Sequence, residues 1–228
     1  LTVPAISTSR RSVMDAQRGD EYLDYSLRLL DKAKAIGCDM VSYGFFQAFT
    51  PAQEKALWFW LADGHVDDPA RRDEAIAKTQ QLADRAAANG QQITLEMYED
   101  TYVGTCDEAV AFLKDVDRPN VGLNPDIPNY VRLHRPMEPI QSMWDKVLPH
   151  TNYWHVKNYL RDEDPASGVV TTFPTSMEAG IINYRAAITQ AVAGGFTGAF
   201  LCEHYGGDAL GNIARNRDYI RGVLATIL

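Results

Sequence analysis

Short apolar runs and amphipathic stretches alternate along nearly the whole chain of 228 residues. Six apolar runs are each followed by a pattern of helical length. Alternation of this kind predicts a parallel sheet whose strands are joined by right-handed helical crossovers. An open doubly wound sheet and a closed barrel both fit it. No GxGxxG or GxxxxGK[ST] motif follows any run, which disfavours the nucleotide-binding versions of the open sheet.

Helices are expected where apolar residues recur every three or four positions, and strands where short apolar runs end in polar or turn residues. Gly37 and Gly90 are expected to end two helices, and Thr105 is expected to cap another. The expected helices are 22–36, 71–88, 105–116, 138–148, 184–193 and 208–227, and the expected strands are 1–7, 40–46, 93–96, 121–126, 153–155 and 199–203. Segment 47–70 is expected to be irregular, and 161–180 to be a long loop.

Composition is ordinary for a soluble globular protein, with 46% hydrophobic and 23% charged residues. The net charge of −8 argues against nucleic acid or an anionic membrane as the main partner. Three cysteines without a CxxC spacing argue against a disulfide framework and favour a reducing cytoplasm. No apolar run is long enough to span a bilayer, and no signal peptide is visible.

Four carboxylate or imidazole side chains stand at the ends of successive apolar runs. They are Glu96, Asp126, His155 and Glu203. The first three are about one strand–helix unit apart, and the last interval is longer by the 161–180 loop. Neighbouring parallel strands would bring all four to one rim of a barrel. Taken singly, each could be a helix cap, a surface carboxylate or a core histidine, but their shared position favours a metal site.

Three carboxylates and one imidazole form a mostly oxygen ligand set. Such a set favours Mn²⁺, with Mg²⁺, Co²⁺ or Zn²⁺ as alternatives, over a structural zinc. Four protein ligands leave about two octahedral positions for adjacent sugar oxygens. A cation held in this way can polarise a carbonyl and stabilise an enediolate.

Four segments resemble the metal-ligand motifs of the sugar phosphate isomerase/epimerase superfamily, the xylose isomerase-like barrels. These segments are Thr94–Glu96, Val121–Asp126, Trp154–Asn158 and Leu201–Glu203. The resemblance runs from about residue 1 to the end and begins at what would be the family's third strand. It implies an α/β fold, a (β/α) TIM-type barrel in one domain over 1–228. Because a barrel needs eight units, we expect the first two βα units to be absent from this chain, having been cleaved or being supplied by another chain.

The resemblance also implies roles for particular positions, and two of them depart from the ketose 3-epimerase pattern. Tyr102 stands where those enzymes carry a second Glu, and Asn129 stands where many members carry a His. Arg161 matches the epimerase arginine. Endonuclease IV, another member, needs a histidine-rich zinc site, whereas this chain has five histidines in total and an acidic balance. DNA repair is therefore disfavoured.

Several further groups near the expected rim have acid–base or binding chemistry. We expect Glu96, Glu203, Lys157 and His204 to act in catalysis, and Arg161, Arg132, His134 and Tyr102 to contact the substrate. The alternatives are that His204 faces the barrel wall and that Arg132 and His134 lie on a solvated loop. Glu99 and Asp100 are expected to cap the following helix. Residues 56–61 are aromatic, and a lid, a subunit interface and packing against the barrel all fit them.

The first hypothesis is a metal-dependent isomerase or epimerase acting on a sugar or keto-sugar. The second is a lyase on the same scaffold, because the stretch 126–135 is similar to that of actinobacterial-type members that dehydrate inososes or release an aglycone from 3-oxo-C-glycosides. The third is a barrel that has lost catalysis and serves as an interaction subunit. The expected partners are a small sugar-derived substrate and a homo-oligomer, with a small partner subunit as an additional option.

Overall fold

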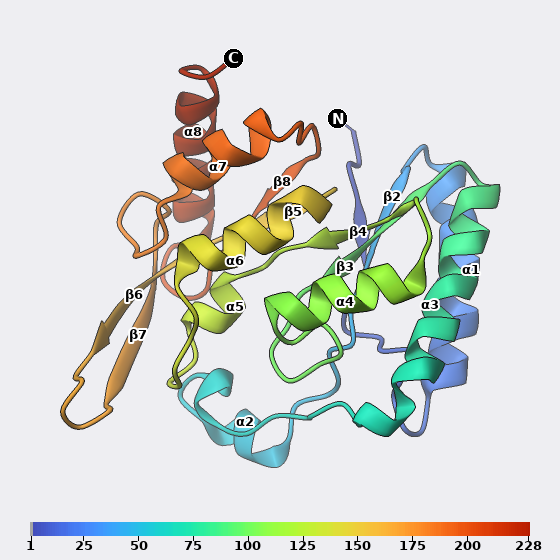
Figure 1. Ribbon diagram of the computed structural model, residues 1–228, viewed down its shortest axis with the longest axis horizontal. Coiled ribbons are helices and arrows are strands. Elements are labelled where there is room, and N and C mark those ends of the chain that lie inside the picture. Colours follow the sequence, from blue (N-terminus) through green and yellow to red (C-terminus); the bar gives the residue numbers. More distant parts are fainter. Residues whose placement is uncertain (1) are drawn as a thin grey trace. The chain divides into compact units, whose positions relative to one another are not determined.

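The chain divides into two compact units in a computed structural model that describes residues 2–228. Unit 1 ends at Asn124, and unit 2 runs from Pro125 to Leu228. Each unit has its own strands and helices, which Figure 1 labels in chain order.

Unit 1 is built on a four-stranded sheet in the order β1-β2-β3-β4. Its strands are β1 (Ile6–Ser7), β2 (Met40–Tyr43), β3 (Gln92–Glu96) and β4 (Val121–Asn124). All three pairings are parallel. The runs in β2 to β4 are almost wholly buried, as strands of a parallel sheet covered by helices should be.

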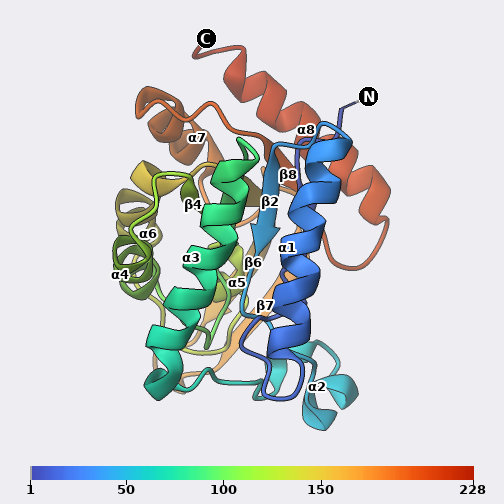
Figure 2. The same cartoon turned by 90° about the vertical axis from the view of Figure 1, so that its right-hand side faces the viewer.

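Two long helices of unit 1 lie side by side along β2, as Figure 2 shows. They are α1 (Gly19–Ala35) and α3 (Arg72–Ala88), and α4 (Cys106–Val116) packs beside α3. Thr105 caps α4 by accepting a hydrogen bond from the Glu108 backbone N–H, so the expected cap is confirmed. The expected caps Glu99 and Asp100 are wrong, because both lie several residues before the helix begins.

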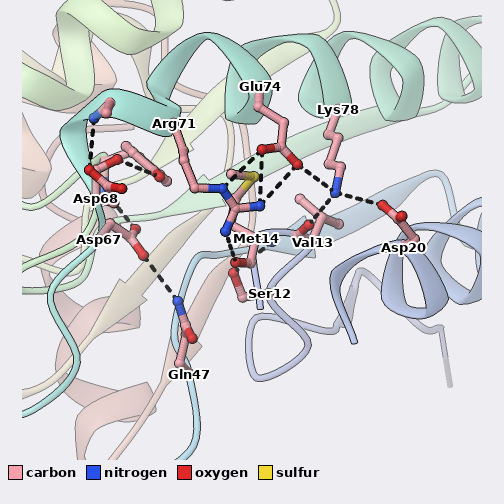
Figure 3. Close-up of polar contacts among 12 residues, drawn as sticks. Ser12, Val13, Met14, Asp20, Gln47, Asp67, Asp68, Arg71, Glu74 and Lys78 are labelled. Atoms are coloured by element: carbon pink, nitrogen blue, oxygen red, sulfur yellow. Dashed lines mark hydrogen bonds and ion pairs between the residues drawn. The ribbon is translucent and has the colours of Figure 1, made fainter. Parts of the chain in front are cut away.

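The loop before α1 is tied to α3 by a polar network, drawn in Figure 3. Lys78 donates to the carbonyl of Val13 at 3.0 Å and to Asp20 at 2.8 Å. Arg71 donates to the carbonyl of Met14 at 3.3 Å and is paired with Glu74. These bonds satisfy backbone carbonyls that a loop leaves without strand partners.

Segment 47–70, which we expected to be irregular, contains or adjoins three short helical elements. They are α2 (Pro51–Lys55), η1 (Phe59–Leu61) and η2 (Pro69–Arg71). Thr50 and Gln53 form a reciprocal capping box at the start of α2, which the sequence analysis did not identify. Trp58 and Trp60 stack with ring centroids 4.7 Å apart.

Unit 2 contains a parallel pair, β5 (Trp154–Val156) with β8 (Phe200–Cys202), and an antiparallel pair, β6 (Asn158–Glu163) with β7 (Val170–Thr175). In Figure 1 the β6–β7 ribbon extends away from α7 and α8. The expectation of a structureless loop over 161–180 is therefore wrong. The run Val169-Val170-Thr171-Thr172-Phe173 is rich in strand-forming residues, and it pairs with the chain just after His155.

The helices of unit 2 follow the expected pattern closely. They are α5 (Pro128–Val131), α6 (Ile140–Val147), α7 (Tyr184–Ala193) and α8 (Ala209–Leu224), with a short η3 (Leu148–His150) after α6. Their core is aromatic. Trp154 lies in β5 and packs within about 6 Å of Trp144, Tyr184, Phe196 and Phe200, measured between ring centroids. Helix α5 was not expected.

Within residues 2–228, no helix is long and apolar enough to cross a membrane. Apart from the antiparallel β6–β7 pair, the described strands pair in parallel and alternate with helices, which confirms the expected α/β class.

Candidate active site

Three of the four expected ligand residues belong to unit 2, and they lie in a strand or within two residues after one. Asp126 begins the turn that leads into α5, His155 lies in β5, and Glu203 directly follows β8. The pairing of β5 with β8 puts His155 and Glu203 on neighbouring strands. Asp126 is fully buried and His155 is 5% exposed. Oδ2 of Asp126 lies 3.7 Å from Nδ1 of His155.

Lys157 joins two of these carboxylates. Its Nζ donates to Oδ2 of Asp126 and to Oε2 of Glu203, both at 2.5 Å. Burial alone would lower the pKa of Lys157, but the charges of Asp126 and Glu203 raise it well above its ordinary value. Lys157 is therefore an ammonium ion that holds the two carboxylates together.

The backbone around Lys157 is fixed from behind by Tyr184, the first residue of α7. The Tyr184 hydroxyl donates to the carbonyl of Lys157 at 2.8 Å and accepts from its N–H at 3.3 Å. Tyr184 is fully buried, and burial raises the pKa of its phenol. A neutral phenol at this position keeps Lys157 at the join between β5 and β6.

Glu96, the fourth expected ligand, belongs to unit 1. It is the last residue of β3 and pairs with Asn124 at the end of β4. The N–H of Met97 continues the ladder by donating to the carbonyl of Asn124 at 3.0 Å. Glu96 is half-buried at the carboxyl edge of the unit 1 sheet, where the strand-end pattern predicted it.

Arg132 and Tyr205 lie near Lys157. The Arg132 guanidinium carbon is 6.0 Å from the ring centroid of Tyr205, and Nζ of Lys157 is 5.6 Å from the same centroid. Arg132 is fully buried, so it does not lie on a solvated loop. Burial raises the pKa of Tyr205, which keeps its phenol neutral. The sequence analysis did not select Tyr205, because nothing distinguishes a single tyrosine after a strand.

Two of the expected substrate contacts are engaged with the protein's own groups. Arg161 is 8% exposed and donates to backbone carbonyls of the segment after α5. The Tyr102 ring lies in unit 1, 5.2 Å from that of Phe45, and its hydroxyl donates to the carbonyl of Asp68 at 2.9 Å. Burial raises the pKa of Tyr102 to about 12.

The two expected histidines differ in their surroundings. His134 is exposed, and its Nε2 lies 3.2 Å from the hydroxyl of Thr172. His204 is half-buried, directly after Glu203, and burial lowers its pKa. Burial likewise lowers the pKa of His134, with a contribution from Arg161. Both imidazoles are therefore neutral at pH 7 and can accept a proton.

Cys202 does not have the surroundings of a nucleophile. Cys38, Cys106 and Cys202 are all free thiols. Burial raises the pKa of Cys202 to about 11, so its thiol stays protonated at neutral pH. Reactive cysteines require a lowered pKa.

The carboxylates and imidazole of unit 2 are donors that a divalent cation can use. A buried carboxylate and a buried imidazole face each other, and a second carboxylate shares the same ammonium partner. Lys157 uses one oxygen of each carboxylate, and a carboxylate has two oxygens that can bind. Carboxylate and imidazole donors suit Mg²⁺, Mn²⁺ and related cations. Asp126 and His155 are the side chains of unit 2 that belong to a carboxylate–histidine group able to hold a metal, and Glu203 stays a candidate ligand through the Lys157 partner that it shares with Asp126.

Comparison with known proteins places this chain in a family. The model of the xylose isomerase-like TIM barrel family matches residues 1–223. A crystal structure of a xylose isomerase-like TIM barrel protein from Mycobacterium smegmatis in complex with magnesium is 53% identical, with a TM-score of 0.97. That match covers 100% of this chain and 74% of the other. A comparison with curated proteins finds no match.

More distant structures share the fold. Mannonate dehydratase from Streptococcus suis is 16% identical with a TM-score of 0.69, over 98% of this chain and 77% of that one. D-Psicose 3-epimerase with D-tagatose from Clostridium cellulolyticum is 17% identical with a TM-score of 0.62, over 98% and 78%. Epimerases and dehydratases thus share this scaffold. The chain belongs to the xylose isomerase-like TIM barrel family.

Proposed function

We propose that the protein is a divalent-metal-dependent enzyme that moves a proton next to the carbonyl of a keto-sugar. The proposed ligands are Glu96, Asp126, His155 and Glu203. The observation that carries the proposal is the buried unit 2 cluster, in which Asp126 faces His155 and shares Lys157 with Glu203. The magnesium in the 53% identical relative supports a hard divalent cation. Mg²⁺ is the first cation to test, and Mn²⁺, expected from the ligand set, is the second.

The cation, when bound, supplies Lewis acidity at the substrate carbonyl and makes the neighbouring C–H more acidic. The other roles belong to the chain itself. Glu203 is the half-buried carboxylate of the cluster, and we assign proton transfer to it, with Glu96 as the second carboxylate. Lys157 holds Asp126 and Glu203 in place. His204, neutral at pH 7, is the candidate base that accepts a proton from a substrate hydroxyl.

Substrate contact is assigned to Arg132 in unit 2. A guanidinium has a planar set of donors that suits hydroxyl, carboxylate or phosphate oxygens, and that of Arg132 is buried beside Tyr205. The Tyr205 ring centroid lies 6.0 Å from the Arg132 guanidinium carbon and 5.6 Å from Nζ of Lys157, so a substrate bound by Arg132 would lie near this ring. His134, whose Nε2 lies 3.2 Å from the Thr172 hydroxyl, and Tyr102, whose hydroxyl donates to the carbonyl of Asp68, are the other proposed contacts.

Isomerisation and elimination share their first step. Removal of the proton beside the carbonyl yields an epimer when the proton returns on the other face, and an alkene when a β-substituent leaves. A 3-epimerase needs a carboxylate on each face, and Tyr102 stands where the resemblance implies an additional one. Its ring packs inside unit 1 and its hydroxyl donates to a backbone carbonyl. This favours a lyase, either an inosose-type dehydratase or a 3-oxo-C-glycoside deglycosidase, as the second candidate.

The two candidates separate in one experiment. Purified protein with Mg²⁺ or Mn²⁺ is incubated in D₂O with D-fructose and, separately, with a 3-oxo-C-glycoside. Deuterium incorporation with a new epimer supports the isomerase, and release of the aglycone supports the lyase. Glu203→Gln should abolish either reaction, whereas Glu178→Gln, an exposed glutamate of unit 2, should not. Exchange and turnover that persist in Glu203→Gln would contradict the proposed base.

We propose a homo-oligomer in the cytoplasm, with a small partner subunit if the lyase assignment holds. Light scattering of the purified chain, alone and with co-expressed partners, tests this proposal.

A further inference from the structure

The donors of Arg161 are all directed to other parts of unit 2. Its Nη1 donates to the carbonyls of Val131 at 2.8 Å and Leu133 at 2.5 Å, and its Nη2 donates to that of Arg135 at 2.9 Å. Nε donates to Glu163, whose carboxylate also pairs with Nη2. A guanidinium has five N–H groups, and these five contacts use all of them. No donor of Arg161 is left for a substrate oxygen.

Thr172 pairs with Arg161 across the β6–β7 ribbon. Its side chain contacts the same segment, residues 131–135. Its hydroxyl donates to the carbonyl of Arg132 at 2.9 Å. A hydroxyl has one proton, so toward Nε2 of His134, 3.2 Å away, it can only accept. The His134 ring is therefore held with its proton on Nε2. Both members of the cross-strand pair are buried.

Together the two side chains contact every residue of segment 131–135. Arg161 takes the carbonyls of residues 131, 133 and 135, and Thr172 takes the carbonyl of 132 and the ring of 134. Apart from α5, this segment lies outside regular structure, so its backbone conformation depends on these bonds. The side chain that it fixes is Arg132, which lies beside Tyr205.

We propose that Arg161 and Thr172 form a clamp that positions segment 131–135, and through it Arg132, for binding an oxygen-rich substrate. The inference rests on the proposed function in one respect, namely that Arg132 contacts the substrate. Arg161 is then a positioning residue, not a substrate ligand. The β6–β7 ribbon, which the sequence pattern predicted to be a loop, carries the two side chains that hold Arg132 in place.

The clamp is tested by hydrogen–deuterium exchange of the full chain, read in peptides that span 131–135. Thr172→Val removes the hydroxyl with little change in shape, and Thr171→Val makes the same change at the exposed neighbouring position. Exchange in 131–135 should rise about tenfold in Thr172→Val and stay unchanged in Thr171→Val. Arg161→Lys keeps the positive charge but loses the planar guanidinium that donates to several carbonyls at once. We therefore expect the exchange rate in 131–135 to rise about a hundredfold. Thr172→Ser should restore slow exchange.

Unchanged exchange in 131–135 for both Arg161→Lys and Thr172→Val, in variants that melt like the wild type, would overturn the clamp. Its role in binding is read from kinetics with whichever of D-fructose or the 3-oxo-C-glycoside the protein converts. Arg161→Lys should raise KM about tenfold with a smaller change in kcat. The same substitution should have no further effect in an Arg132→Lys background. Additive effects would overturn positioning through Arg132.

Failure of the proposed function would look different. If the wild type converts neither probe and binds neither Mg²⁺ nor Mn²⁺, the enzymatic assignment falls. The exchange data would still decide whether Arg161 and Thr172 hold the segment.

Discussion

Each unit contains a buried lysine that bridges two carboxylates, but the carboxylates differ in how exposed they are to water. Lys78 in unit 1 lies 2.8 Å from Asp20 and 3.0 Å from Glu74, and it also donates to a backbone carbonyl. The carboxylate side chains that it meets are 93% and 41% exposed. Lys157 in unit 2 also meets two carboxylates, but the Asp126 side chain is fully buried and that of Glu203 is 32% exposed. The carboxylates bound by Lys78 are therefore better solvated than those bound by Lys157.

The difference in solvation separates structure from function. Around Lys78, water stabilises the carboxylates, so the lysine mainly anchors the loop before α1 to α3. Around Lys157, the protein has buried an anion that water cannot stabilise, and it keeps an imidazole 3.7 Å away. Burial of charge at this density is costly unless every charge is paired. Sites that maintain such a cost are typically functional.

The largest expected effect comes from Lys157→Met. Loss of the ammonium leaves Asp126 buried without its cation, so the free energy of unfolding should fall by about 3–5 kcal/mol. Urea denaturation measures this loss. Because a divalent cation can replace the lost charge, added Mg²⁺ should raise the melting temperature of the variant more than that of the wild type. A loss below about 1 kcal/mol would show that the unit 2 carboxylates do not depend on Lys157.

Lys78→Met should have a smaller effect. Its carboxylate partners stay hydrated when the ammonium is removed, so the main loss is the hydrogen bond to the carbonyl of Val13. We expect about 1 kcal/mol by urea denaturation. Mg²⁺ affinity should not change. A loss as large as that in Lys157→Met would erase the distinction between the two lysines.

The smallest effect is expected for Asp20→Asn and appears only in acid. Lys78 lowers the pKa of Asp20 below its ordinary value of 3.8, first through the hydrogen bond. A carboxyl whose pKa is lowered on folding contributes stability above pH 3.8 and loses it as pH falls through the folded-state value. Urea midpoints of the wild type should therefore drop below pH 3.8, and those of Asp20→Asn should drop less. Parallel curves would mean that Asp20 does not sense Lys78 in solution.

Much of the fold could be predicted because its signals are local. Helix α7 has the predicted bounds, Tyr184–Ala193, and α3 and α4 begin within one residue of the prediction. The ends of the parallel strands were marked by single polar residues after apolar runs, which is why Asp126, His155 and Glu203 could be selected. Periodicity and strand ends depend only on neighbouring residues.

The missed features depend on partners far apart in the chain. The β6–β7 ribbon was hidden because the turn residues Pro165 and Gly168 suggested a loop, while strand formation required pairing of Arg161 with Thr172. The sequence analysis named Lys157 a catalytic candidate, but not the bridge that it makes between Asp126 and Glu203, 31 and 46 positions away. Arg161 was expected at the substrate because sequence cannot show that its donors are already used.

We propose that the strand-end carboxylates and His155 hold a divalent cation, and titration calorimetry with Mg²⁺ measures this binding. Protein prepared without chelator and then stripped of metal is compared with Glu203→Gln and with the exposed control Glu178→Gln. The account predicts about one Mg²⁺ per chain for the wild type and the control, and an affinity at least about tenfold weaker for Glu203→Gln. A wild type that binds neither Mg²⁺ nor Mn²⁺ would contradict it, and so would a Glu203→Gln variant that binds either as tightly as the wild type.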